Sequence, residues 1–215
     1  MSAFFAIVRR DLRLSLGSGG IALPVIFFLL VATLYPFAVG PDGALLTRTG
    51  GGMLWVAALL AALLPLDRLI APDAESGVLD QYGVRGLGEE MVATAKILAH
   101  WLGFGPPLML AALPAAALLR LDAPTLAAVE LGLLAGTPGL AALGVLVASL
   151  TAGVRRAGAL GGLLMLPLAV PLIIFGAGSI GDFGGGALRF LAASSLFLVA
   201  ITPFAAGAGI RALRE

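Results

Sequence analysis

Long stretches without any charged side chain are the feature that most constrains this chain of 215 residues. Each stretch reaches the ~18 residues that a helix, rising about 1.5 Å per residue, needs to cross roughly 30 Å of hydrocarbon. The charge-free stretches cover residues 14–41, 49–66, 97–119, 131–154, 157–181 and 190–210. Hydrocarbon offers no water to a polar backbone, and no alternating barrel pattern is present, so the stretches predict six membrane-spanning helices.

The predicted fold is therefore an all-α, polytopic membrane domain over residues 1–215. The composition agrees, because 60% of the residues are hydrophobic and only 12% are charged, against about a quarter charged in soluble proteins. The 12 acidic and 13 basic residues nearly cancel, which argues against a nucleic-acid-binding surface. The predicted spans are residues 21–40, 51–66, 97–119, 125–150, 158–178 and 189–210.

Several kinds of chemistry lack the residues that they need. The chain has no cysteine, which excludes disulfide exchange and thiolate metal sites. Lys96 is the only lysine and follows Ala95, so no phosphate-binding GxxxxGK[ST] loop exists. His100 is the only histidine, which excludes the HExxH zinc motif. We expect no catalytic, cofactor-binding or metal-binding residue in this chain.

The basic residues predict how the chain is oriented. With an even number of spans, both termini lie on the same side of the membrane. Placing them inside assigns ten basic residues to the cytoplasm and leaves only Arg48, Arg120 and Arg189 outside. The ten are Arg9, Arg10, Arg13, Arg68, Arg85, Lys96, Arg155, Arg156, Arg211 and Arg214. The positive-inside rule therefore predicts cytoplasmic termini.

The segment before the first span, residues 1–17, is amphipathic. On a helical projection, one stripe is apolar and consists of Phe5, Val8, Leu12 and Leu16. The other face carries Arg9, Arg10 and Arg13. This pattern predicts a helix lying along the inner membrane surface, and the alternative is a basic leader that only directs insertion.

The connection between the second and third spans, residues 67–96, is the longest loop. It holds six acidic and three basic residues, although the positive-inside rule favours basic residues on that side. Pro72 and Asp73 resemble a helix start, and Gly83 and Gly86 can end it. The pattern predicts a short cytoplasmic helix that docks on a partner, and the alternative is an ordinary solvated loop helix.

The predicted spans contain few polar residues. His100 lies about one turn into the third span, where a haem ligand or a proton relay is conceivable, but we interpret it as structural. Glu130 lies about two turns into the fourth span and is a candidate pathway residue, the alternative being a carboxylate that reaches water. Two GxxxG pairs, Gly132 with Gly136 and Gly158 with Gly162, predict close helix packing.

Five segments in the same order along the chain resemble one family, the CcmB membrane permeases of the haem exporter of cytochrome c maturation. The longest segment is GTPGLAALGVLVASLTAGVRRAGALGGLLMLPLAVPLIIFG (136–176). The others are FFLLVATLYPFAVGP (27–41), MLWVAALLAALLPLDRL (53–69), AKILAHW (95–101) and ITPFAAGAGIRA (201–212). The chain departs from the family at residues 84–88, where the family usually has a Leu- and Pro-rich turn.

The resemblance implies a permease subunit of the ABC export type, resident in the bacterial inner membrane. Its implied partners are a separate ATPase (CcmA-like), a haem-handling subunit (CcmC-like), a small subunit (CcmD-like) and a periplasmic haem chaperone (CcmE-like). ATP hydrolysis on the ATPase would release the haem-loaded chaperone. ATP and haem would be bound by partner subunits and not by this chain.

In this family reading, residues 4–16 form the elbow helix and residues 73–82 form the coupling helix that sits on the ATPase. The implied coupling residues are Asp73, Glu75, Val78, Leu79, Asp80 and Tyr82. The alternative functions are another ABC-2-type permease, or a secondary transporter for a small hydrophobic substrate, which should show broken helices or a buried ionisable pathway. An intramembrane enzyme is a further alternative and would need a nucleophile with a base or a set of metal ligands.

Overall fold

The computed structural model describes residues 3–17, 19–40, 42–154, 157–181 and 184–214. Ten α-helices and no strand occur within these ranges. In chain order they are α1 (Ala3–Gly17), α2 (Ala22–Val39), α3 (Gly43–Leu63), α4 (Leu66–Leu69), α5 (Ala71–Glu75), α6 (Val78–Val84), α7 (Glu89–Leu118), α8 (Ala123–Thr151), α9 (Ala157–Gly178) and α10 (Gly184–Ala212). Arg155, Arg156 and Asp182, which the sequence places at the ends of predicted spans, lie outside the described residues.

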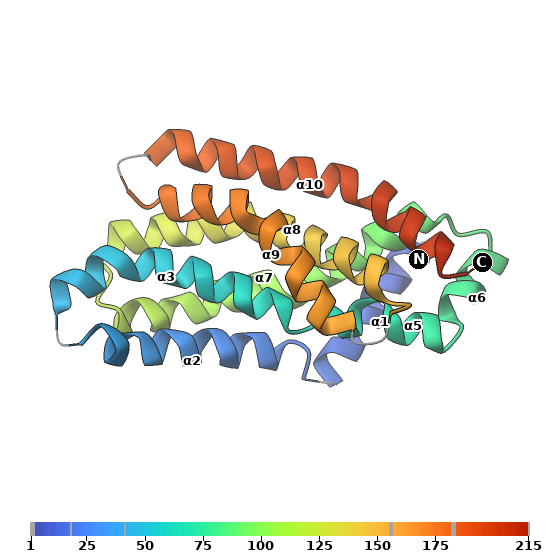
Figure 1. Ribbon diagram of the computed structural model, residues 1–215, viewed down its shortest axis with the longest axis horizontal. Helices are drawn as coiled ribbons and strands as arrows, with labels where there is room; N and C mark the ends of the chain where they lie inside the picture. The colour runs from blue at the N-terminus through green and yellow to red at the C-terminus, as the bar shows by residue number, and fades with distance from the viewer. Residues whose placement is uncertain (1–2, 18, 41, 155–156, 182–183, 215) are drawn as a thin grey trace.

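Six of the described helices, α2, α3, α7, α8, α9 and α10, are long and apolar enough to cross a membrane. This confirms the prediction of an all-α, six-span membrane domain. In Figure 1 the long helices run along the long axis of the molecule, whereas α1, α5, α6 and both chain termini gather at one end. We call this end the N/C end.

Two of the long helices begin well before the predicted spans. α3 starts at Gly43 and includes Arg48, because the side chain of Asp42 caps it by accepting a hydrogen bond from the backbone of Leu45 at 3.0 Å. α7 starts at Glu89 and includes Lys96. The charge-free stretches therefore mark the apolar part of each helix, and the helices themselves extend beyond it.

The bundle is organised around α8. In the most apolar stretch of each helix, 72% of the α8 residues are buried, against 17% in α2, 22% in α9 and 28% in α10. α8 packs against α3, α7, α9 and α10. Helices α2, α9 and α10 therefore present most of their apolar surface outward, as expected of helices solvated by lipid.

The predicted GxxxG pairs differ in what they contact. A Cβ built on Gly136 would come within 2.5 Å of the ring of Trp55, and Gly132 also faces that ring. The first pair thus makes room for the fully buried Trp55 of α3. Gly158 lies against Asp67, while Gly162 has nothing within 4 Å of an added Cβ, so the second pair does not form one packing site.

Candidate functional site

The connection between α3 and α7 consists of the three short helices α4, α5 and α6 at the N/C end. A single helix over residues 73–82 was expected, but the chain turns at Gly77. Its φ of +71° lies in the left-handed region that glycine adopts without a Cβ clash. Two short helices, α5 and α6, therefore replace the one docking helix that the sequence predicted.

Of the residues predicted to start and end a helix in this connection, only some do so. Pro72 lies in the first turn of α5, but no side chain caps that helix, so Asp73 is not its cap. α6 ends where Gly86 adopts a φ of +70° and its N–H donates to the carbonyl of Gly83 at 2.8 Å. Gly86 is therefore the terminator, while Gly83 remains inside α6.

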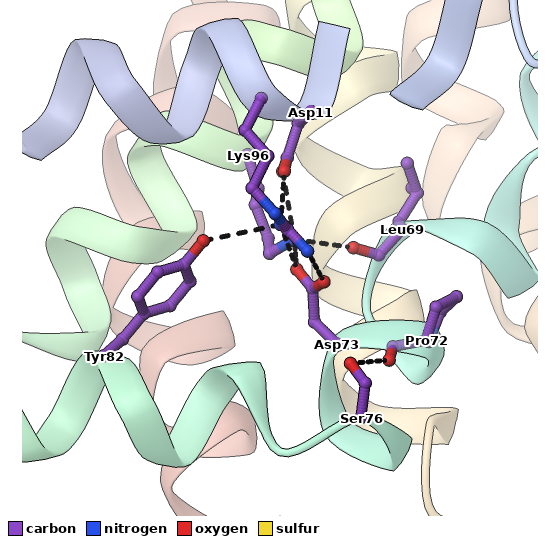
Figure 2. Close-up of polar contacts among 8 residues, drawn as sticks. Asp11, Leu69, Pro72, Asp73, Ser76, Tyr82 and Lys96 are labelled. Atoms are coloured by element: carbon purple, nitrogen blue, oxygen red, sulfur yellow. Dashed lines mark hydrogen bonds and ion pairs between the residues drawn. The ribbon is translucent and has the colours of Figure 1, made fainter. Parts of the chain in front are cut away.

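Four charged side chains from three helices meet at the N/C end, and we call them the charge cluster (Figure 2). Arg10 and Asp11 come from α1, Asp73 from α5 and Lys96 from α7. Lys96 Nζ lies 2.5 Å from Asp73 Oδ2 and 3.0 Å from Asp11 Oδ2. Arg10 donates to Asp11 Oδ1 at 2.8 Å and binds both carboxylate oxygens of Asp73.

The charge cluster is largely buried and electrically balanced. Lys96 is 4% exposed and Asp73 is 6% exposed. The third acceptor around Lys96 Nζ is the backbone carbonyl of Leu69 at 3.1 Å, so each N–H of the ammonium group has an acceptor. Two cations and two carboxylates sum to zero, which limits the cost of removing them from water.

Asp73 remains ionised at neutral pH. Burial alone would raise the pKa of its carboxyl, but the hydrogen bond from Arg10 and the charge of Lys96 outweigh burial and hold the pKa below the ordinary value. The same hydrogen bond raises the pKa of Arg10. The contact between α1 and α5 is therefore a charged one.

The charge cluster fastens α5 to two other helices. Asp73 accepts from Arg10 of α1 and from Lys96 of α7. Tyr82 of α6 adds a longer contact, in which its hydroxyl accepts from Arg10 Nη1 at 3.4 Å. A displacement of α5 would have to break these contacts or move α1 and α7 with it.

A second group of charges, which we call the α10 pairs, joins the end of α10 to α6 and α7. Arg214 lies 2.5 Å from Glu89 and 3.6 Å from Asp80. Arg211 lies 3.2 Å from Glu90 and 3.5 Å from Glu89. The side chain of Arg214 also covers Gly83 of α6, where an added Cβ would come within 1.7 Å of its Nη2.

The predicted coupling residues separate into three groups by exposure. Glu75 and Asp80 are exposed, Val78 and Tyr82 are half-buried, and Asp73 and Leu79 are buried. Asp73 belongs to the charge cluster, and Leu79 packs in the apolar core with residues of α1 and α7. Asp73 and Leu79 thus face this chain's own interior, so direct contact with a partner is left to the exposed residues.

Two polar residues, His100 and Glu130, were predicted within the spans, and neither belongs to the charge cluster. His100 is buried, stacks on Phe104 with ring centroids 5.6 Å apart, and places Nε2 against Gly144 of α8. Glu130 lies on α8, and its buried Oε1 has no hydrogen-bond partner. No group of three or more His, Asp or Glu that could hold a metal ion occurs among the described residues.

Sequence reasoning missed three of the four residues of the charge cluster. Arg10 was assigned to the polar face of the amphipathic segment and Lys96 was used to exclude a phosphate-binding loop, both were counted as charges that set orientation, and Asp11 was not singled out. Two signals point to them: Asp11 is the one acidic residue in the basic segment before α2, and Lys96 interrupts an otherwise apolar run. Neither signal says which charges meet.

Comparisons with known proteins agree along nearly the whole length of the chain. Residues 2–213 match the family model described as CcmB protein. "Heme exporter protein B" of Rhodobacter capsulatus is 47% identical over 212 residues, covering 96% of this chain and 97% of the relative. The protein of the same name from Bradyrhizobium diazoefficiens is 46% identical over 218 residues, covering 98% of each chain. That of Escherichia coli K12 is 39% identical over 214 residues, covering 97% of each.

Proposed function

The chain belongs to the CcmB protein family, and from this premise we propose that it is the membrane permease subunit of an ABC-type haem exporter in cytochrome c maturation. The near-complete coverage of relatives named "Heme exporter protein B" supports this function. The chain acts as a non-catalytic subunit, and a separate CcmA-like ATPase binds and hydrolyses ATP. Hydrolysis drives release of a haem-loaded CcmE-like chaperone.

The remaining partners and the location extend the same proposal. A CcmC-like subunit handles haem beside this chain, a small CcmD-like subunit completes the assembly, and this chain binds no haem itself. The complex lies in the bacterial inner membrane with the N/C end in the cytoplasm, as the ten-to-three distribution of basic residues favours. The N/C end is then the side on which ATP is available.

The attachment of α5 to α1 and α7 is the observation that best supports a coupling role. A partner pressing on the exposed Glu75 and Asp80 would act on a segment that the charge cluster holds to one spanning helix. The side chain of Val84, at the end of α6, is 90% exposed and offers an apolar contact. In this scheme the ATPase contacts the exposed residues and displaces α5, and the ion pairs of Asp73 with Arg10 and Lys96 then displace α1 and α7.

The test is a double substitution at the exposed residues, Glu75→Lys with Val84→Asp. It leaves the charge cluster and the α10 pairs intact, so we expect the six spans to insert normally. A partly buried charged contact at an interface is typically worth about 2–5 kcal/mol, so co-purification of the ATPase should fall and haem-bound chaperone should accumulate. The matched control is Arg189→Glu, a charge reversal of an exposed residue near the other end of α10.

Two outcomes would contradict the proposal. If the double variant co-purifies with the ATPase and releases the chaperone normally, α5 and α6 are not the coupling surface. If cells that lack this chain mature cytochrome c at a normal rate, the haem-export function is wrong.

A further inference from the structure

Helix α1 packs on the chain with one side and leaves the opposite side uncovered. Ile7 and Val8 are 3% and 6% exposed and pack in the apolar core with residues of α7. On a helix with 3.6 residues per turn, Arg9 and Arg13 lie on the other side, and both are exposed. The proposed coupling function uses Arg10 of this helix but gives no role to the uncovered side.

Two large apolar side chains share the uncovered side with the arginines. Phe5 precedes Arg9 by four residues, and Leu16 follows Arg13 by three, which makes them neighbours on a helix surface. Phe5 and Leu16 are 59% and 66% exposed. The apolar stripe that the sequence predicted is therefore divided, because Val8 packs inward while Phe5 and Leu16 face outward. We call Phe5, Arg9, Arg13 and Leu16 the outer face of α1.

The two arginines of the outer face carry charges that are not neutralised by contact. Among the described residues, neither Arg9 nor Arg13 has a hydrogen bond or an ion pair. Arg10 and Asp11, which lie between them in the sequence, are engaged in the charge cluster, and that cluster sums to zero. The outer face therefore presents two positive charges with an apolar side chain on either side.

The position of α1 in the chain brings the outer face to a membrane surface. α1 ends at Gly17, and the spanning helix α2 begins at Ala22, so α1 lies close to the point where α2 enters lipid. Helices that combine basic residues with Phe and Leu in this way lie at the boundary between head groups and acyl chains. Head groups match the arginines and acyl chains match Phe5 and Leu16, whereas without a membrane both apolar side chains would meet water.

We propose that the outer face of α1 binds anionic phospholipids of the leaflet at the N/C end. Arg9 and Arg13 each hold a phosphate, since a guanidinium binds phosphate through two N–H groups. Phe5 and Leu16 enter the acyl region beside them. The inference is independent of the proposed haem export, because it rests on the exposure and charge of α1. Since α1 also belongs to the charge cluster, lipid binding holds that cluster at the membrane surface.

The first test is native mass spectrometry of the full chain in detergent, titrated separately with phosphatidylglycerol and phosphatidylcholine. The double variant Arg9→Gln with Arg13→Gln should bind phosphatidylglycerol about thirtyfold more weakly, or about fivefold for each arginine, and phosphatidylcholine as the parent does. The matched control, Arg85→Gln with Arg189→Gln, removes the same charge from exposed arginines outside α1. It should keep the preference of the parent for phosphatidylglycerol.

The second test locates the apolar side chains of the outer face. The chain has no cysteine, so a nitroxide can be attached to Phe5→Cys or Leu16→Cys in nanodiscs that contain phosphatidylglycerol. Both labels should be relaxed more by oxygen, which concentrates in lipid, than by a water-soluble nickel chelate. The matched control is Val84→Cys on α6, an apolar position at the same end that is 90% exposed, whose label should respond mainly to nickel.

Three outcomes would overturn the proposal. The first is equally tight binding of phosphatidylglycerol by the parent and the double arginine variant. The second is a parent that binds phosphatidylcholine as tightly as phosphatidylglycerol. The third is a pair of labels at residues 5 and 16 that respond to nickel as strongly as the label at residue 84. A double arginine variant that keeps its lipids but no longer co-purifies with the ATPase would give the first outcome and assign the outer face to a protein partner. Failure of the haem-export function would change none of these readouts.

Discussion

The charge cluster and the α10 pairs join helices at the same end of the molecule but in different surroundings. In the charge cluster, the side chains of Lys96 and Asp73 are 3% and 8% exposed, and each makes contacts with two charged partners. Within the α10 pairs, the side chains of Arg211 and Glu90 are 54% and 41% exposed, whereas those of Arg214 and Glu89 are 25% and 18% exposed. Water and salt therefore screen the pair of Arg211 with Glu90 much more than the charge cluster.

This difference separates a rigid attachment from an adjustable one. Removing one member of a buried ion pair leaves a charge without water or a partner, whereas an exposed charge that loses its partner is solvated at once. The contact of α5 with α1 and α7 should therefore persist through a working cycle. The contact of α10 with α7 through Arg211 and Glu90 can open at little cost.

The largest expected effect comes from Lys96→Met, which removes the most buried cation of the charge cluster. It leaves the carboxylates of Asp11 and Asp73 with Arg10 alone, so the free energy of unfolding should fall by about 3–5 kcal/mol. The measurement is equilibrium unfolding of the purified chain in mixed micelles. Adding Asp73→Asn to Lys96→Met should restore part of the loss, and a loss below about 1 kcal/mol in Lys96→Met would remove the distinction between the two groups.

A smaller effect is expected from acid, and it concerns Asp73. Because the pKa of this carboxyl is lower in the folded chain than its ordinary value, its stabilising contribution is complete above the ordinary carboxyl pKa of about 4. That contribution is lost as the pH falls through the lower folded pKa. The parent should therefore lose more stability than Asp73→Asn on acidification in this range, as measured by unfolding temperature against pH. Parallel curves for the two proteins would show that Asp73 is not held as an ion.

The smallest effect is expected from Arg211→Ala, within the α10 pairs. Its loss should change the free energy of unfolding by about 0–1 kcal/mol, and 1 M salt should abolish the difference, because the Debye length then falls to about 3 Å. Lys96→Met measured under the same conditions should keep most of its effect at high salt. An Arg211→Ala effect as large and as salt-resistant as that of Lys96→Met would mean that the two groups do not differ.

Several features of this chain could be predicted because they depend on local composition. Six charge-free stretches specify six apolar helices, since a backbone in lipid must satisfy its own hydrogen bonds. The segment 3–17 is helical as its periodicity predicts, and Gly86 ends α6 because glycine accepts a positive φ. The turn at Gly77 was not predicted. A glycine allows such a turn, but Pro72 and Asp73 suggested the start of one continuous helix.

The face that each helix presents to its neighbours was decided only by the tertiary structure. In α1, Val8 is buried against α7, whereas Phe5 and Leu16 of the same predicted stripe are 59% and 66% exposed. Leu79 packs inward, although its position in α6 suggested a contact for a partner. Periodicity defines an apolar face but not the neighbour that covers it.

The meeting of charges shows the same limit most clearly. Sequence by itself determined how many charges the chain has and, through the charge-free stretches between them, where the six long apolar helices lie. Asp73 pairs with Arg10 across 63 positions and with Lys96 across 23, and no local pattern records such distances. Only the packing of α1, α5 and α7 brings these charges within hydrogen-bonding reach. They are paired there because an unpaired charge in such a buried place would cost too much free energy.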